Sequence, residues 1–159
     1  MTQEIFKCFE DIQKLFKQKV IEVSVKRSQI TLVFSEKMIG VADIEKFSSE
    51  FCGGDKSFVT FDEEFMYLVC ELENNTGFQE LFGPFLEVTQ RVFDEVCKCP
   101  IFEFIVSSRY IKLYLDKQGL TVKDLKAYED IFDDTEGTLE LHGQRPYLLF
   151  INMNFSGDI

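Results

Sequence analysis

The sequence predicts an α+β protein made of two tandem copies of one helix–strand–strand–helix–strand–strand unit, related by a pseudo-two-fold axis. The first observation is an internal alignment of residues 21–72 with residues 102–153 at a constant shift of 81. Of its 52 positions, 19 are apolar in both copies, 22 are polar in both and 11 disagree. The second is that both copies switch between helical and strand periodicity in the same order. A core tolerates exchange between apolar residues more readily than a change of face, so the pattern can persist while identities drift.

A helix is predicted at the start of each copy. Residues 5–16 carry apolar side chains at steps of three and four, which draws one apolar stripe along a helix. Residues 85–96 repeat that spacing, and Pro84 suits the first turn of a helix because its missing N–H needs no partner there.

Two strands are predicted next in each copy. Apolar side chains recur at every second position in residues 21–25 and 30–34, and again in residues 102–106 and 111–115. Alternation with period two is typical of an antiparallel hairpin that is covered on one face only.

The second predicted helix of each copy covers residues 41–51 and residues 122–132. Thr121 is a suitable N-cap, and Asp124 follows three residues later, where it can complete a capping box. Two more strands close each copy, at residues 57–62 with 65–73 and at residues 138–142 with 147–154. The apolar runs at 66–70 and 147–151 predict that these last strands lie centrally in a sheet.

The predicted units are residues 1–76 and residues 77–159, joined near the Asn and Gly residues at 74–77. A unit of about 80 residues has a thin core, so we expect the two to pack as one compact body. They could share one antiparallel sheet or press two sheets together. We favour one shared sheet with the helices on one face, because the last strand of each unit needs a neighbour.

Charge and hydropathy limit the possible partners and location. The net charge is −11, and Lys26 and Arg27 are the only adjacent basic pair. A nucleic-acid backbone needs clustered Lys and Arg, so direct nucleic-acid binding is not expected. No run approaches the roughly 18 apolar residues that cross a bilayer, and the acidic start does not resemble a secretion signal. We therefore predict a cytoplasmic protein that does not bind membranes.

Residues suited to catalysis or metal binding are sparse. The phosphate-loop, dinucleotide, zinc-protease and serine-hydrolase motifs are absent from the sequence. Cys97 and Cys99 lack the further ligands that a zinc site needs, and His142 is the only histidine. We predict no metal, no cofactor and no enzymatic activity; a Cys–His pair that uses His142 is the enzyme alternative.

Two groups of acidic residues are the candidate partner-binding sites. The first is the turn between the last two strands of the first copy, with an adjacent aromatic residue: Asp62, Glu63, Glu64 and Phe65. The second follows the last predicted helix: Glu129, Asp130, Asp133, Asp134 and Glu136. The helix dipole disfavours negative charge at a helix C-terminus, so the second group suggests a use. The alternative is that both are solvated loops. Phe61, Phe65, Phe78 and Phe82 fall in or beside turns, where they could form an interface or cap the small core.

The leading functional hypothesis is a non-enzymatic acidic module that binds another protein with a basic surface. Its sharpest form is an inhibitor or immunity-type antagonist of a nucleic-acid enzyme, in which carboxylates take the place of phosphates. The alternative is a small-ligand-binding or regulatory domain with a pocket between the two repeats. The oligomeric state does not follow from the sequence.

Overall fold

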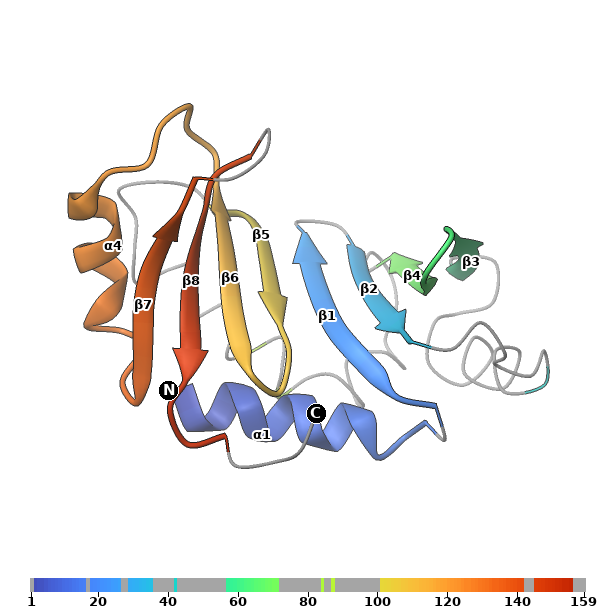
Figure 1. The fold of residues 1–159 in the computed structure, drawn as a ribbon. Helices are drawn as coiled ribbons and strands as arrows, with labels where there is room; N and C mark the ends of the chain where they lie inside the picture. The colour runs from blue at the N-terminus through green and yellow to red at the C-terminus, as the bar shows by residue number, and fades with distance from the viewer. Residues whose placement is uncertain are drawn as a thin grey trace.

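The α+β class and the antiparallel sheet are confirmed in a computed structural model (Figure 1). The structure describes residues 2–16, 18–26, 29–35, 57–71, 101–141 and 145–155, with the single residues 42, 84 and 87. The elements bounded within this part are α1 (Thr2–Gln13), β1 (Val20–Lys26), β2 (Gln29–Phe34), β3 (Ser57–Phe61), β4 (Met66–Glu71), β5 (Ile101–Val106), β6 (Tyr110–Leu115), α4 (Val122–Glu129), β7 (Thr135–Glu140) and β8 (Tyr147–Asn152).

The described strands form one eight-stranded sheet in the order β3-β4-β2-β1-β5-β6-β8-β7. Every neighbouring pair in that order is antiparallel. The two halves of the chain meet at β1 and β5, where Val23 pairs with Val106 and Val25 pairs with Phe104. Central positions therefore belong to β1 and β5. The prediction that β4 and β8 lie centrally is wrong, because each is second from an end of the sheet.

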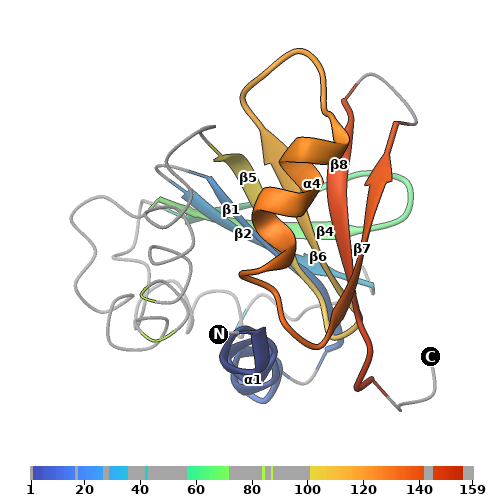
Figure 2. The ribbon, with the colours of Figure 1, turned by 90° about the vertical axis from the view of Figure 1, so that its left-hand side faces the viewer.

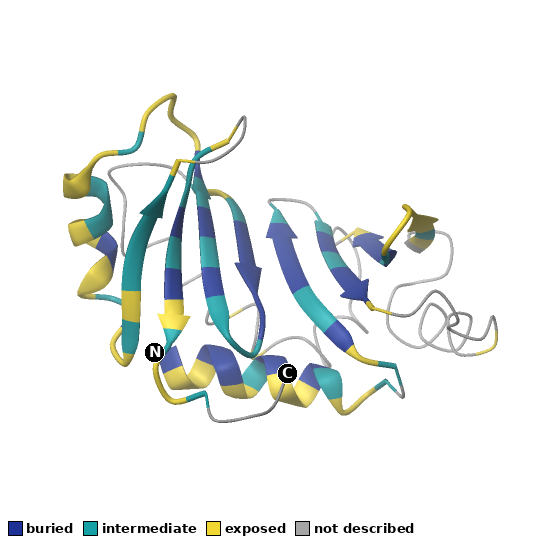
Figure 3. Ribbon diagram, viewed as in Figure 1, coloured by how far each residue is buried: buried dark blue, intermediate teal, exposed yellow. Residues whose placement is uncertain are grey.

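Both described helices pack on the same face of the sheet (Figure 2). Their buried side chains join the strand residues of that face in a single apolar core. The helix side of this core is formed by Ile5, Phe6, Phe9 and Ile12 of α1, by Tyr128 of α4, and by Phe132 just after α4. Figure 3 shows the buried side of α1 turned toward the strands and its exposed side turned away.

The α1 helix forms where the apolar stripe predicts it. Ile5, Phe6, Phe9 and Ile12 are each less than 5% exposed. At its end, the Gln13 side chain donates to the Gln18 carbonyl oxygen at 3.0 Å and accepts from the Val20 N–H at 2.6 Å. One amide side chain at the end of α1 thus satisfies two backbone groups at the start of β1 and fixes how the helix connects to the sheet.

The predicted capping box of α4 is confirmed. The Thr121 hydroxyl accepts from the Asp124 N–H at 3.3 Å, and the Asp124 carboxylate accepts from the Thr121 N–H at 2.8 Å. The Lys117 ammonium also contacts that carboxylate at 2.7 Å. Burial opposes ionisation of Asp124, but the hydrogen bonds from Lys117 and Thr121 outweigh it and lower the pKa of this carboxyl.

The strand registers correct the ungapped alignment. Leu68 of β4 lies opposite Leu32 of β2. In the same way, Leu148 of β8 lies opposite Leu113 of β6. The shift of 81 relates Leu32 to Leu113, but it relates Leu68 to the half-exposed Leu149 instead of the buried Leu148. Leu68 and Leu148, which hold the same register position beside Leu32 and Leu113, are 80 residues apart, not 81. A shift of one residue moves every side chain to the other face of a strand, so the alignment fails there.

Three predictions fall on residues outside the described part of the chain. They are the helix at 41–51, the helix at 85–96 and the boundary between residues 76 and 77; of these, only residues 42 and 87 are described. None of the helices in the described part has the length and the apolar composition that crossing a membrane requires.

Candidate functional site

The two acidic groups lie at opposite ends of the sheet. Asp62, Glu63, Glu64 and Phe65 connect β3 to β4, whereas Glu129 to Glu136 run from the end of α4 into β7. Since β3 and β7 are the first and last strands of the order, the groups are separated across the sheet by about 34 Å at roughly 4.8 Å per strand. They do not form one site.

Asp62 has a structural role in its turn. Its carboxylate accepts from the N–H groups of Glu64 and Phe65 at 2.8 and 2.7 Å, and the Tyr67 hydroxyl donates to it as well. The last of these bonds is the main reason why the pKa of Tyr67 is raised to about 12. Glu63 and Glu64 are exposed, and the Phe65 ring packs edge-on against Tyr67 at 6.5 Å.

The second acidic group is divided among three elements. Glu129 and Asp130 end α4, whereas Glu136 belongs to β7, which begins three residues before the predicted strand. The backbone turns tightly just before β7, because Asp134 adopts a φ of 59°. The Asp133 carboxylate accepts from the Thr2 hydroxyl at 2.8 Å, and this bond lowers the pKa of Asp133. Asp133 thus lies at the N-terminus of α1, where the helix dipole favours a negative charge.

The face of the sheet opposite the helices carries many aromatic side chains. We call it the open face, because neither α1 nor α4 lies over it (Figure 2). Its side chains alternate with the core residues and are Phe58, Thr60, Tyr67, Val69, Thr31, Val33, Glu22, Ser24, Lys26, Glu103, Ile105, Tyr110, Lys112, Tyr114, Tyr147, Leu149, Ile151, Glu136, Thr138 and Glu140.

The densest part of the open face lies over β5, β6 and β8. We call it the tyrosine patch and define it as the open-face residues Tyr110, Lys112, Tyr114 and Tyr147 together with two adjoining residues, Phe102 at the register shift of β5 and Arg145 just before β8. The rings of Tyr114 and Tyr147 are 5.2 Å apart between centroids. The Lys112 ammonium lies 4.7 Å from the Tyr110 ring and 5.1 Å from the Tyr147 ring. The patch is therefore one connected array of rings and a cation.

Carboxylates of β1 and β5 hold the patch in place. The Tyr110 hydroxyl donates to Glu22, and the Lys112 ammonium is 4.0 Å from the same carboxylate. Burial and the Glu22 hydrogen bond raise the pKa of Tyr110, so its hydroxyl stays protonated and able to donate. Burial is also the main reason why the pKa of Tyr114 is raised.

The cations at the edge of the patch stack on Phe102. The Arg145 guanidinium lies 4.0 Å from the centroid of this ring, and the Lys26 ammonium lies 5.7 Å from it. Glu103 balances Lys26 at 3.9 Å and accepts from the Ser24 hydroxyl at 2.7 Å. The rings and cations of the patch are thus held in place by contacts within the chain.

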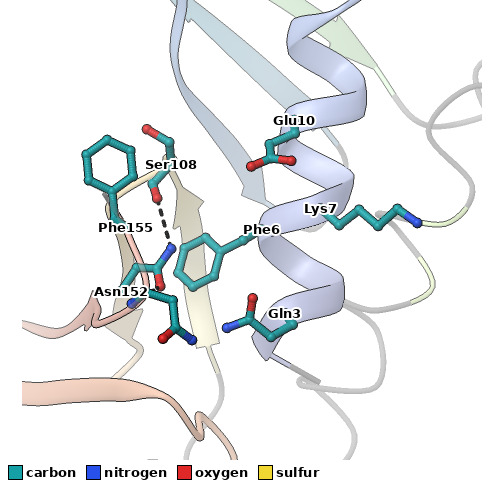
Figure 4. Close-up of a pocket in the computed structure, with 8 residues that line it drawn as sticks. Gln3, Phe6, Lys7, Glu10, Ser108, Asn152 and Phe155 are labelled. Carbon is teal, nitrogen blue, oxygen red and sulfur yellow. Dashed lines mark hydrogen bonds between the residues drawn. The ribbon is translucent and has the colours of Figure 1, made fainter. Parts of the chain in front are cut away.

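A pocket of about 570 Å³ lies between α1 and the end of β8 (Figure 4). Its lining comes from both halves of the chain: Gln3, Phe6, Lys7, Glu10, Ser108, Asn152, Asn154 and Phe155. Figure 4 shows the Glu10 carboxylate turned toward Ser108 and Phe155, whereas the Lys7 side chain extends away. The Asn152 amide donates to the Ser108 carbonyl oxygen at 3.1 Å, so part of this polar lining is already paired.

Within the part of the chain that the structure describes, no three His, Cys, Asp or Glu side chains lie close enough together to hold a metal ion. Cys97, Cys99 and His142 are outside that part, so the absence of a metal stays a prediction.

Comparison with known proteins adds no relative. No protein-family model, curated protein or solved structure matches the chain.

The tyrosine patch was not predicted from the sequence, although one signal was present. Tyr110, Lys112 and Tyr114 alternate with buried residues along β6, so two large rings occupy the positions expected to be polar. The other members come from β5, from Arg145 and from β8, which are distant in sequence. Their proximity depends on strand order, which periodicity does not give.

Proposed function

We propose that the protein is a non-enzymatic module that docks another protein on the open face of its sheet, with the tyrosine patch at the centre of the contact. The observation that carries the proposal is this array of rings and cations on a face that neither α1 nor α4 covers. Tyr, Phe and Arg are enriched in the centres of protein interfaces, and Tyr and Arg are frequent among the residues that dominate binding energy.

The partner that fits has a basic surface. Glu136 and Glu140 flank the patch on β7, and the chain carries a net charge of −11. Acidic residues at the rim of an aromatic contact steer a basic partner toward it and raise the association rate. An inhibitor that covers the basic groove of a nucleic-acid enzyme is the narrowest form of this proposal. Its binding should weaken as salt screens the rim charges.

The test is affinity capture from the native extract with the wild type and a Tyr114→Ala/Tyr147→Ala double variant, followed by measurement of affinity for the captured protein. Both rings are only half-buried, so their loss should leave the fold intact. We expect affinity to fall by about thirtyfold or more, as for loss of central contact residues.

The matched control is Lys123→Ala/Lys126→Ala on the exposed side of α4. It should bind like the wild type, and thermal unfolding of both variants checks their folding. Unchanged affinity in the tyrosine variant would remove the proposed docking surface. A Glu63→Gln/Glu64→Gln variant measures separately whether the acidic turn contributes.

A second candidate function is the binding of a small ligand in the pocket beside α1. What favours it is the lining, which combines α1 with the β5–β6 turn and the end of β8 and so joins the two halves of the chain. A ligand held there would stabilise the fold by mass action. A thermal-shift screen tests it: a ligand should raise the unfolding temperature of the wild type but not that of a Phe155→Ala/Glu10→Ala variant.

The proposal includes a duplicated origin, with both halves related by a pseudo-two-fold axis between β1 and β5. In its support, each half places its strands from the centre outward as first, second, fourth and third. At a shift of 80, Tyr67 corresponds to Tyr147, and the buried Leu68 and Cys70 correspond to the buried Leu148 and Phe150. An experimental structure in which the two helix–strand units failed to superimpose would contradict it.

A further inference from the structure

Among the described strands, β3 ends the sheet, and its own residues include none of the charges or prolines that commonly protect a sheet edge. It pairs with β4, and no other described strand lies beside it (Figure 1). Its five residues, Ser57–Phe61, include no charged residue and no proline. Phe58 is 53% exposed and Phe61 is 60% exposed. An edge strand of this kind is a template for pairing with another strand, and proteins commonly protect such edges with charges.

The hydrogen-bonding pattern shows which backbone groups of β3 point away from β4. The Asp62 N–H donates to the Phe65 carbonyl oxygen at 3.1 Å, at the end of the ladder where β3 turns into β4. Hydrogen-bonded pairs alternate with non-bonded pairs along an antiparallel ladder. Counting back from Asp62, the backbone groups of Thr60 and Phe58 point to β4. Those of Phe61, Val59 and Ser57 therefore point away from β4.

We infer that two copies of this chain pair through β3, antiparallel, with a two-fold axis at Val59. In this register Val59 lies opposite Val59 of the second copy, and Ser57 lies opposite Phe61. These are the three residues whose backbone groups point outward, so every outward group on β3 is paired. Phe58 lies opposite Thr60 of the second copy on the open face, which is a favourable aromatic–β-branched pair.

The β7 strand at the other end of the sheet explains why pairing uses β3. Thr60 lies opposite Tyr67 on β4, and Glu140 lies opposite Tyr147 on β8. Glu140 thus occupies on β7 the position that Thr60 occupies on β3. A two-fold pairing of β7 strands would bring two Glu140 carboxylates diagonally together, whereas pairing of β3 strands brings two neutral threonines together.

Pairing through β3 gives the two open faces a common orientation. Opposed residues of an antiparallel ladder project to the same side of the sheet, so the two-fold axis stands perpendicular to it. A five-residue strand pair is smaller than a standard interface, so the dimer should be weak and dependent on concentration. A partner that presents two contact sites would then gain from binding both open faces at once.

The test introduces a positive or a negative charge at Thr60, an exposed residue that can be replaced without loss of core packing. Sedimentation velocity of the full chain over a range of concentrations, at about 0.15 M salt to limit long-range repulsion, should show a reversible monomer–dimer equilibrium. Thr60→Lys and Thr60→Glu should each weaken self-association at least about fivefold, because two like charges then lie diagonally across the pair. An equimolar mixture of the two variants should form a heterodimer.

Thr138→Lys on β7 is the matched control and should dimerise like the wild type, because it makes the same substitution at the opposite edge. Circular dichroism checks that each variant folds. A wild type that stays monomeric at all concentrations would overturn the inference. Dimerisation of Thr60→Lys as strong as that of the wild type, or an equimolar mixture that fails to associate, would overturn it as well.

Discussion

Replacing Phe104 with alanine should destabilise the whole chain, because this ring connects the two halves. Phe104 is 0% exposed and lies opposite Val25 across the β1–β5 junction. The centroid of its ring is 6.5 Å from that of the Phe132 ring. Phe132 in turn lies 4.7 Å from Phe150 on β8. Truncation of a buried Phe costs about 3–5 kcal/mol of unfolding free energy. The loss of a ring–ring contact worth about 0.5–1.5 kcal/mol favours the upper end of that range.

The assay is urea unfolding combined with native-state hydrogen exchange. We expect the opening free energies of β2 and β4 to fall by about as much as those of β6 and β8, because one core is shared. Phe102→Ala is the matched control; it lies two residues away at the register shift of β5, where its ring contacts the Arg145 guanidinium and not the core. Phe102 is 38% exposed, and the change should cost about 1 kcal/mol or less through its cation contacts. The reasoning is refuted if Phe104→Ala weakens β6 and β8 but leaves protection in β2 and β4 unchanged.

Two further predictions concern the cap of α4 and the β3–β4 turn. Thr121→Ala should lower the unfolding free energy by about 1 kcal/mol in urea titrations. Asp124→Asn should lower the unfolding free energy at neutral pH. The pKa of Asp124 is lowered from 3.8 in the fold, so its carboxylate stabilises the fold above pH 3.8 and this contribution is lost as the pH falls through the lowered pKa. The difference in unfolding free energy between the variant and the wild type should therefore vanish at pH values below the lowered pKa. Asp62→Asn should shift the pKa of Tyr67 from about 12 back toward 10, measured by tyrosine titration against a Tyr67→Phe reference. Because the pKa of Tyr67 is raised in the fold, its hydroxyl stabilises the wild type below pH 10, and this contribution is lost as the pH rises from 10 to about 12. The Asp62→Asn variant should therefore lose less unfolding free energy than the wild type over this interval. Equal losses would contradict the role of the Asp62 bond.

Periodicity was sufficient to predict most of the strands. The recurrence of Ile30, Leu32 and Phe34 at every second position, and the matching pattern on β6, identified the buried face because sheets alternate with period two. The capping residues Thr121 and Asp124 placed the start of α4 for a similarly local reason.

The features that the sequence did not predict depend on contacts between residues that are distant in the chain. The ungapped alignment matched Leu68 with Leu149, since a single-residue shift is invisible while both Leu148 and Leu149 are apolar. The strand order, which separates the two acidic groups, could not be predicted either, because periodicity describes single strands and not their neighbours. Asp62 and Asp133 were predicted as partner-binding residues; both are exposed, and their hydrogen bonds to Tyr67 and Thr2, which pair residues across a turn and across the chain, were not predicted.

Site-specific photo-crosslinking tests the open face most directly as the docking surface. A photoreactive residue is placed in turn at Leu149 on the open face, at Glu63 in the acidic turn and at Lys123 on α4, and each protein is irradiated in the native extract. The account predicts a partner crosslinked from Leu149, with little or none from Lys123. Crosslinks from Glu63 or Lys123 without any from Leu149 would contradict it.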